Sequence, residues 1–247
     1  GTVALGSVTA PTGKTFEYEK EFKYLDYVGD QHLTFNNTAT IVETKQSASA
    51  VLKVNKLNED LTVTKTVNTS FTRTHKWLID KWVTTDNGDT IGEEKIPKIW
   101  LLEGYNESES AYWHVKVDYD GYIDSAHLVT GTITIVNNGT QDAVITSVDD
   151  LLGGTAITVD FGDVTFPYTL EVGETLIGSY SEDGEFEGNN VVTVTTEVDT
   201  YSDTKPIVWG DPATEINKTV NISDLSDLFG TVALGSVTAP TGKTFEY

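Results

Sequence analysis

Polar and apolar residues alternate along much of the chain, and a period of two predicts β-strands. In residues 16–24, aromatic side chains alternate with Glu and Lys, as expected of half-buried strands. Runs rich in Thr, Val and Ile predict further strands at 38–44, 49–55, 61–67, 131–136 and 191–198. Their branched side chains fit a pleated sheet and crowd a helix. The pattern therefore predicts an all-β protein.

Turn signals separate these runs at short intervals. Asn138-Gly139 directly follows an alternating run and predicts a hairpin. Helical signals are slight, and we expect single turns only, at 149–153 and 223–228. Short strands at this spacing are typical of Greek-key β-sandwiches of immunoglobulin-like (Ig-like) architecture. The chain has no Cys, so the Cys–Trp–Cys pattern of true immunoglobulin domains is excluded.

The last eighteen residues repeat the first eighteen without a change. Residues 1–18 and 230–247 both read GTVALGSVTAPTGKTFEY, and the second copy starts 229 residues after the first. The chain is therefore either one period of a tandem array, continuing into the next copy, or a subunit whose tail duplicates its head. In both interpretations the expected partner is another copy of this chain. One sandwich has room for one copy of the segment, which favours the array.

Two short sequence motifs each occur twice within the 229-residue repeat and divide it into two parts. Lys-Thr-Val-Asn occurs at 65–68 and 218–221, and Asn-Asn at 36–37 and 189–190, both with an offset of 153. We expect two Ig-like modules per repeat. The larger, module A, spans 55–204 and includes an insertion near 86–112. The body of module B is 1–54, and residues 205–229 of the preceding copy complete it. In the same way, residues 205–247 of this chain hold the opening strand of the next module B together with the repeated segment 230–247.

Three stretches resemble a known class of proteins. They are residues 63–77, residues 129–138 with 148–150, and residues 209–221 continuing into 36–44. Together they resemble the tandem Ig-like (prealbumin-like) repeats of large bacterial and archaeal cell-surface or filament proteins. The resemblance implies an extracellular, cell-surface structural or adhesive protein without enzymatic activity.

Composition narrows the range of partners. The net charge is −22, which repels phosphate backbones and argues against nucleic acid. Without Cys there are no thiolate metal sites or Cys nucleophiles. The four His residues fit no catalytic or zinc-binding motif. No apolar run has the length of a membrane span, and no signal peptide is present in this segment. We therefore expect neither an enzyme nor membrane insertion by this segment.

The duplicated segment predicts head-to-tail assembly by strand complementation. An edge strand is unstable alone because its N–H and C=O groups are unpaired, and an added strand satisfies them. The apolar residues expected to be buried on joining are Val3, Leu5, Phe16, Tyr18, Val220, Ile222, Val232, Leu234, Phe245 and Tyr247. The resulting hypothesis is a filament or stalk repeat; the alternative is a cell-surface adhesin or carbohydrate-binding module that binds glycans through Trp100 or Trp113.

Two further kinds of site are expected on the surface. Asp118, Asp120 and Asp124 surround Gly121 and are the first candidates for calcium, although an acidic loop facing water is the favoured interpretation and no other cofactor is expected. Sequons suited to a glycosylated surface protein occur at Asn36, Asn68, Asn106, Asn138, Asn217 and Asn221.

A covalent Lys–Asn bond is also conceivable. Lys65 or Lys218 on an opening strand could face Asn37 or Asn190 on a closing one. The reaction would need a buried carboxylate beside the pair, and the sequence does not identify one.

Overall fold

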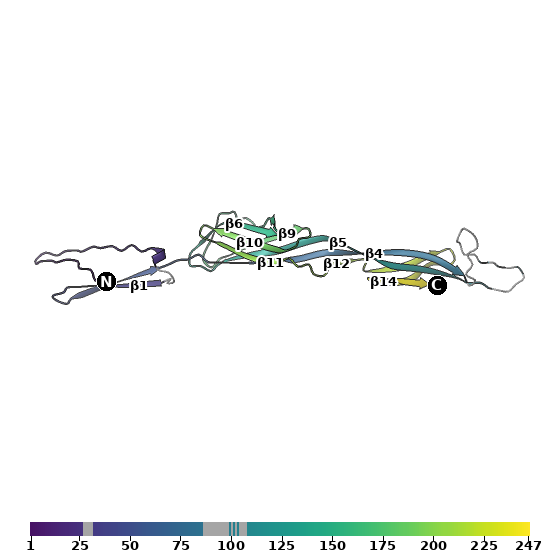
Figure 1. Ribbon diagram of the computed structural model, residues 1–247, viewed down its shortest axis with the longest axis horizontal. Helices are drawn as coiled ribbons and strands as arrows, with labels where there is room; N and C mark the ends of the chain where they lie inside the picture. Colours follow the sequence, from purple (N-terminus) through teal and green to yellow (C-terminus); the bar gives the residue numbers. More distant parts are fainter. Residues whose placement is uncertain (27–31, 86–98, 100, 102, 104–107) are drawn as a thin grey trace.

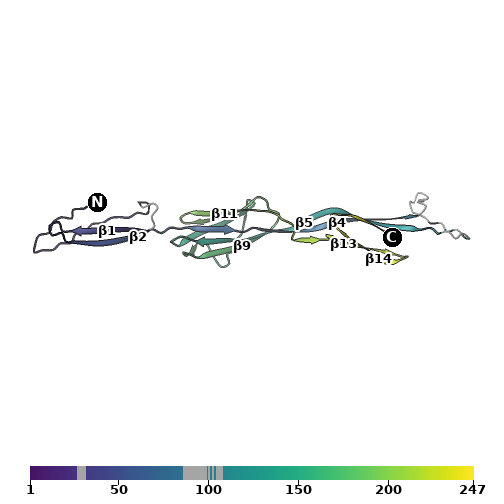
Figure 2. The same cartoon turned by 90° about the horizontal axis from the view of Figure 1, so that it is seen from below.

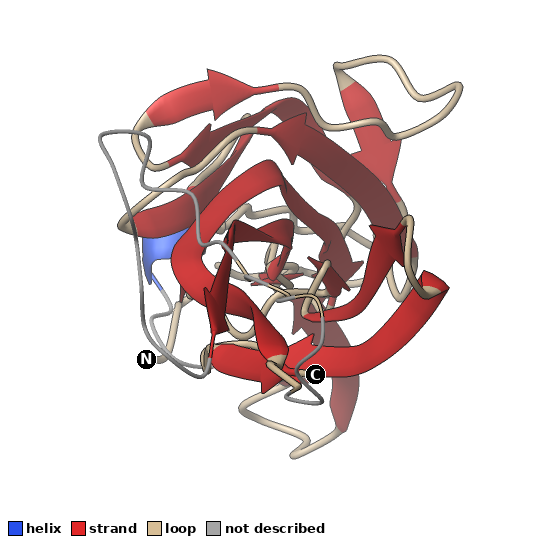
Figure 3. Ribbon diagram, turned by 90° about the vertical axis from the view of Figure 1, so that its right-hand side faces the viewer, coloured by secondary structure: helices blue, strands red, loops and turns tan. Residues whose placement is uncertain are grey.

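The computed structural model describes residues 1–247 except 27–31, 86–98, 100, 102 and 104–107. Strands make nearly all of its regular structure (Figure 3), which confirms the all-β prediction. One 3₁₀ turn, η1, covers Tyr24–Asp26. The strands are β1 His32–Thr40, β2 Ser47–Asn55, β3 Leu61–Lys65, β4 Asn68–Thr85, β5 Ala111–Asn137, β6 Ala143–Leu152, β7 Thr155–Ile157, β8 Tyr168–Leu170, β9 Thr175–Asp183, β10 Asn189–Thr196, β11 Thr200–Pro206, β12 Thr214–Ile216, β13 Thr219–Ser226, β14 Gly230–Thr238 and β15 Lys243–Glu246.

A two-layer β-sandwich forms the middle of the molecule (Figures 1 and 2). In one layer, the C-terminal half of β5 lies between β3 and β9, antiparallel to both. In the other, the strand order is β11-β10-β6-β7, and β8 also pairs with β6. Alternate side chains of both layers meet between them, and the fully buried ones include Ile133, Ile135, Ile145, Val192 and Val194. This is the largest core of the described chain, and the period-two pattern of the sequence places it there.

A long hairpin leaves the sandwich and continues along the molecular axis. β4 has 18 residues and β5 has 27, and they pair from Asn68↔Thr130 near the sandwich to Thr85↔Ala111 at the far end. The expected insertion near 86–112 begins beyond the last pair of this hairpin, Thr85↔Ala111, and most of it lies outside the described residues. We call the part of the hairpin beyond His75, residues 76–85 and 111–119, the distal hairpin.

The C-terminal strands cover the distal hairpin. β12 runs parallel to β4 from Thr214↔Thr72, after which β13 and β14 form an antiparallel pair and β15 joins the edge of β5. A small second core lies here, separate from that of the sandwich. The two cores are thus connected by two uninterrupted strands, β4 and β5.

The N-terminal part is a hairpin of β1 and β2 alone, at the opposite end of the molecule (Figures 1 and 2). None of its residues is buried, and Ile41, Val51, Leu52 and Leu57 are exposed. A two-stranded sheet is marginal in water without a second layer. This part of the chain therefore presents a sheet without the packing that normally stabilises one.

Three local expectations are corrected. The turns of helix expected at 149–153 and 223–228 are instead the last residues of β6 and β13 followed by non-helical turns, because cross-strand pairing outweighs a weak local preference. The alternating residues 16–24 form no strand, since no neighbouring strand pairs with them. The hairpin predicted at Asn138-Gly139 is wrong: these residues lie between β5 and β6, which belong to different layers and do not pair, because the chain crosses here from one layer to the other.

Candidate assembly site

The C-terminal copy of the duplicated segment is seated on the distal hairpin. β15 pairs antiparallel with β5, with Phe245 opposite Val115 and Lys243 opposite Val117. Beyond the strand, the backbones of Trp113 and Tyr247 exchange two hydrogen bonds of 3.0 and 3.1 Å. The segment thereby satisfies the polar groups along one edge of β5.

A compact apolar cluster holds the segment in place. Val115 and Val117 on β5 meet Val237 on β14 and Phe245 on β15, and all four are buried. Five partly buried side chains pack against them: Trp77, Val220, Ile222, Leu234 and Tyr247. Burying one such side chain contributes about 1.5–3 kcal/mol. The cluster is therefore large enough to hold the segment yet small compared with a domain core.

The N-terminal copy of the same segment has similar local geometry but lacks these partners. Gly6 and Gly235 have φ of 110° and 121°, and the same turn bond, from Thr12 N to Thr9 O and from Thr241 N to Thr238 O, measures 3.2 Å in both copies. The segment itself therefore determines its central turn, whereas only the C-terminal copy forms strands. Its surroundings determine its burial, since Val8 is 47% exposed and its counterpart Val237 is 4% exposed.

One hydroxyl group distinguishes the two copies. Tyr18 accepts a hydrogen bond from Asn37 Nδ2 on β1. The equivalent Tyr247 hydroxyl is shut off from solvent and has no hydrogen-bond partner within the described part of the chain. An unpaired buried hydroxyl costs about 1–3 kcal/mol. The C-terminal copy thus lacks the contact that the β1–β2 hairpin supplies to the N-terminal copy.

The residues expected to be buried on joining separate into two groups. In the C-terminal region, Phe245 is buried, and Val220, Ile222, Val232, Leu234 and Tyr247 are partly buried. At the N-terminus, Val3, Leu5 and Tyr18 are exposed and Phe16 is partly buried. These burial classes are those of a single chain, and burial of the set on joining two copies stays a prediction.

Sequence reasoning missed two features of this site. One is the inward position of Val237, which does not follow the alternation that starts at Val232 and Leu234. A β-bulge at Leu234 shifts the inward face by one residue. The available signal was the glycine two residues before the Val in each copy, Gly6 or Gly235. The receiving strand was also missed, although Trp113, Val115, Val117 and Tyr119 alternate in the sequence.

Of the two Trp side chains proposed for glycan binding, the structure describes Trp113, which packs against aromatic rings of the C-terminal region. Trp113 lies 5.7 Å from Phe229 and 6.5 Å from Tyr247, centroid to centroid. Trp100 lies outside the described residues. The Trp113 ring therefore packs against neighbouring aromatic rings rather than lying open as a flat platform for sugars.

The three carboxylates suggested for calcium are each directed to a basic residue. Asp118 pairs with Lys116 at 2.8 Å, and Asp120 lies 3.9 Å from Lys76. Asp124 accepts two hydrogen bonds of 2.8 Å from Arg73, which hold the pKa of that carboxyl below its ordinary value. Among the described residues no group of three or more His, Asp or Glu side chains is placed to hold a metal ion. The expected acidic grouping is therefore not formed there.

The described sequons are accessible. Five sequon Asn residues are exposed: Asn36, Asn68, Asn138, Asn217 and Asn221. Asn138 Nδ2 also donates a hydrogen bond of 2.7 Å to Thr62. The sixth sequon, at Asn106, lies outside the described residues.

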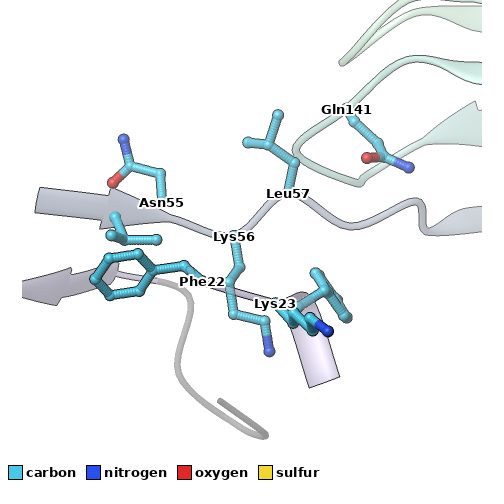
Figure 4. A pocket seen from close by; sticks show the side chains of 8 residues that line it. Phe22, Lys23, Asn55, Lys56, Leu57 and Gln141 are labelled. Atoms are coloured by element: carbon cyan, nitrogen blue, oxygen red, sulfur yellow. The ribbon is translucent and has the colours of Figure 1, made fainter. Parts of the chain in front are cut away.

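An open pocket lies where the N-terminal hairpin meets the sandwich (Figure 4). Its labelled side chains come from both parts, with Phe22, Asn55 and Lys56 on one side and Gln141 on the other. The ammonium of Lys56 lies 4.1 Å from the ring centroid of Tyr24, which also lines the pocket. Its lining, within the described residues, is basic, aromatic, apolar and amide in character, with neither an acidic residue nor His.

Comparison of the chain with family models, curated proteins and solved structures returns no match. Within the described ranges, no helix has the length and apolar character required to cross a membrane. A function must therefore be argued from the geometry of the chain itself.

Proposed function

We propose that this chain is a repeat of an extracellular filament or stalk whose units join head to tail by β-strand complementation. The proposal rests on the two different environments in which the duplicated eighteen-residue segment is found. Residues 230–247 complete an edge of β5, and the identical residues 1–18 lead into a hairpin that lacks a second layer. The end of one unit thus carries the beginning of the next.

The two copies indicate how the next unit would sit. In the N-terminal copy, Tyr18 contacts Asn37 on β1, and Phe22 lies 5.2 Å from Phe35. If the same relationship follows the C-terminal copy, the β1–β2 hairpin of the next unit lies beside the distal hairpin. Asn37 of the next unit would then pair with the buried Tyr247 hydroxyl. Both unsatisfied features, the orphan hydroxyl and the uncovered hairpin, are resolved by one contact.

A covalent array accounts for these features more simply than separate subunits. In an array, residues 230–247 of one unit are also residues 1–18 of the next, so one segment serves one site. In separate subunits, two identical segments compete for the edge of β5, and the tail has the advantage of being in the same chain. We therefore favour a tandem array on an extracellular surface, with donor-strand exchange between subunits as the second form.

Truncation of the duplicated segment tests this proposal. A chain of residues 1–229 retains the N-terminal copy and leaves the edge of β5 open, so it should form long head-to-tail fibres. A chain of residues 19–229 lacks both copies and should stay monomeric. Light scattering after size-exclusion chromatography and electron microscopy would distinguish the two outcomes.

Point variants of the 1–229 chain provide the matched control. Val8→Asp should abolish fibres because Val8 must enter the buried position that Val237 occupies. Ile177→Asp alters another exposed apolar residue, on the sandwich, and should leave fibres intact. Monomeric 1–229, or fibres unaffected by Val8→Asp, would refute strand complementation. The denatured mass of the native polypeptide then separates an array, many times the repeat mass, from single subunits.

A further inference from the structure

Three polar side chains meet in the centre of the sandwich, away from solvent. They are Lys65 on β3, Asp150 on β6 and Asn190 on β10, with relative exposures of 3%, 2% and 0%. β3 belongs to one layer, and β6 and β10 belong to the other. In the β6–β10 register, Asn190 lies opposite Leu152 and Val192 opposite Asp150. Asp150 and Asn190 are therefore diagonal neighbours on the inward face, directed at the layer that carries Lys65.

Some polar atoms of these three side chains have no hydrogen-bond partner, although Lys65 and Asp150 are paired. Lys65 Nζ lies 2.5 Å from Asp150 Oδ1. The other carboxylate oxygen, Asp150 Oδ2, and both amide atoms of Asn190 are buried without a hydrogen-bond partner among the described residues. Native proteins rarely leave a fully buried carboxamide unpaired at both atoms. The Asn190 amide nevertheless lies close enough to Asp150 and Tyr180 to lower the pKa of both groups against the larger effect of burial, so the three side chains are in contact while hydrogen-bonding capacity remains unused.

We propose that Lys65 and Asn190 react with each other to form an intramolecular isopeptide bond, with Asp150 transferring the protons. The uncharged Lys65 amine attacks Cγ of Asn190 while the protonated Asp150 carboxyl donates a hydrogen bond to Oδ1. The Nζ–Cγ bond forms and the Cγ–Nδ2 bond breaks. Asp150 takes a proton from Nζ and delivers one to Nδ2, which leaves as ammonia. No oxidant, reductant or cofactor is needed, and Asp150 ends in its starting form.

The surroundings of the trio favour the uncharged forms that this step needs. Desolvation lowers the pKa of Lys65, although the hydrogen bond and charge of Asp150 act against it. Desolvation likewise raises the pKa of Asp150, against the opposing effect of Lys65. The ring of Tyr180 lies 5.0 Å from Nζ and its hydroxyl donates to Thr66 O at 2.6 Å. Moving the proton from Lys65 to Asp150 gives a neutral amine and a neutral acid without exposing either to water.

The bond would connect the two layers of the sandwich. The chain enters the sandwich through β3, and β10 is the second-last strand before it leaves toward β12. A link from Lys65 to Asn190 therefore spans nearly the whole module. Force applied along the chain would pass through the link rather than through the hydrogen bonds between strands, so a linked module resists extension. The other pair suggested by the sequence is not assembled, since Lys218 is exposed beside Glu215 and Asn37 is exposed on β1.

Mass spectrometry of the purified 247-residue chain tests the proposal. The expected intact mass is about 17 Da, one ammonia, below that of the sequence. Proteolysis should release a branched peptide joining Lys65 to Asn190. Asp150→Asn, Asn190→Ala and Lys65→Arg should each restore the full mass expected of the variant. Their neighbours on the opposite face, Asp149 and Asn189, provide the matched controls, and Asp149→Ala and Asn189→Ala should retain the loss.

Three results would overturn the proposal. One is a folded wild-type chain, shown by a cooperative melt, whose mass equals that of the sequence. Another is a loss of about 17 Da without the branched peptide, which would indicate an imide formed within Asn190. The last is a loss of about 18 Da with Lys65 joined to Asp150, which would assign the bond to the carboxylate. The wild-type measurement decides the question even if every variant fails to fold.

Discussion

Phe245 lies directly opposite Val115 on β5, and both side chains are buried in the core of the distal hairpin. Phe16, the same residue of the duplicated segment, lies at the other end of the molecule and has no strand opposite it. The same eighteen-residue sequence is thus paired with a strand at one end of the chain and unpaired with any strand at the other. This difference makes the assembly of the chain open to experiment.

Truncating these two phenylalanines should have unequal effects. Phe245→Ala removes a buried ring and should lower the local stability of the distal hairpin by about 3 kcal/mol. Phe16→Ala should change it by less than about 0.5 kcal/mol, because the ring is only partly buried and packs on no core. Hydrogen exchange of the amides of residues 113–117 provides the measurement. Equal exchange rates in the two variants would show that the C-terminal copy is not seated on β5.

Removing the Tyr247 hydroxyl should not weaken the isolated chain. Tyr247→Phe deletes a buried group that lacks a partner, so the free energy of unfolding should stay constant or rise by about 1 kcal/mol. In a chain that extends through residue 55 of the next repeat, the same change should be destabilising, because Asn37 of that repeat would lose its acceptor. Denaturant melts of both lengths test the prediction. A loss of stability in the short chain would mean that the hydroxyl already has a partner there.

Gly131 should be irreplaceable in the sandwich. A Cβ at this position would clash with the backbone oxygen of Thr66 and with the Tyr180 hydroxyl. Gly131→Ala should therefore cost about 3 kcal/mol, since backbone cannot easily move. Gly210→Ala is the control, because a Cβ there has no neighbour within 4 Å, and its effect should stay within about 1 kcal/mol. Thermal melts monitored by circular dichroism compare the two.

The stability of the sandwich should depend on pH through Asp203. Burial raises the pKa of this carboxyl, but the N–H groups of Lys65 and Thr204 and the ammonium of Lys205 outweigh burial and lower it below its ordinary value. A folded pKa below the unfolded one stabilises the protein above the unfolded value and loses that contribution as pH falls through the folded value. Asp203→Asn should therefore lose stability at neutral pH.

The comparison should be made as a series of melts from neutral pH downward. Wild type should lose stability relative to Asp203→Asn as pH falls below about 4, and the gap between the two should close. A gap that stays constant to strongly acidic pH would show that the charge of Asp203 does not contribute. Thr204→Ala, which keeps the carboxylate and its backbone donors, should titrate like wild type.

The strands of the sandwich could be predicted because their signal is local. Val/Ile/Thr alternation indicates which face of residues 131–136 and 191–198 turns inward; the first segment lies wholly in β5, and the second lies in β10 as far as Thr196. The same reasoning failed for residues 16–24, whose alternation is equally clear. A strand needs a partner, and the identity of the partner is not contained in the segment.

The amino-acid sequence by itself determined that the chain is all-β, that it repeats its own beginning, and that its surface is strongly acidic. These are properties of pattern, identity and composition, and they need no three-dimensional information. Only the tertiary structure decided which copy of the segment is buried, that β5 receives it, and that Lys65, Asp150 and Asn190 meet. Residues far apart in the sequence come together through strand pairing and layer packing. Local sequence encodes the preference for a strand but not the partner that the strand will find.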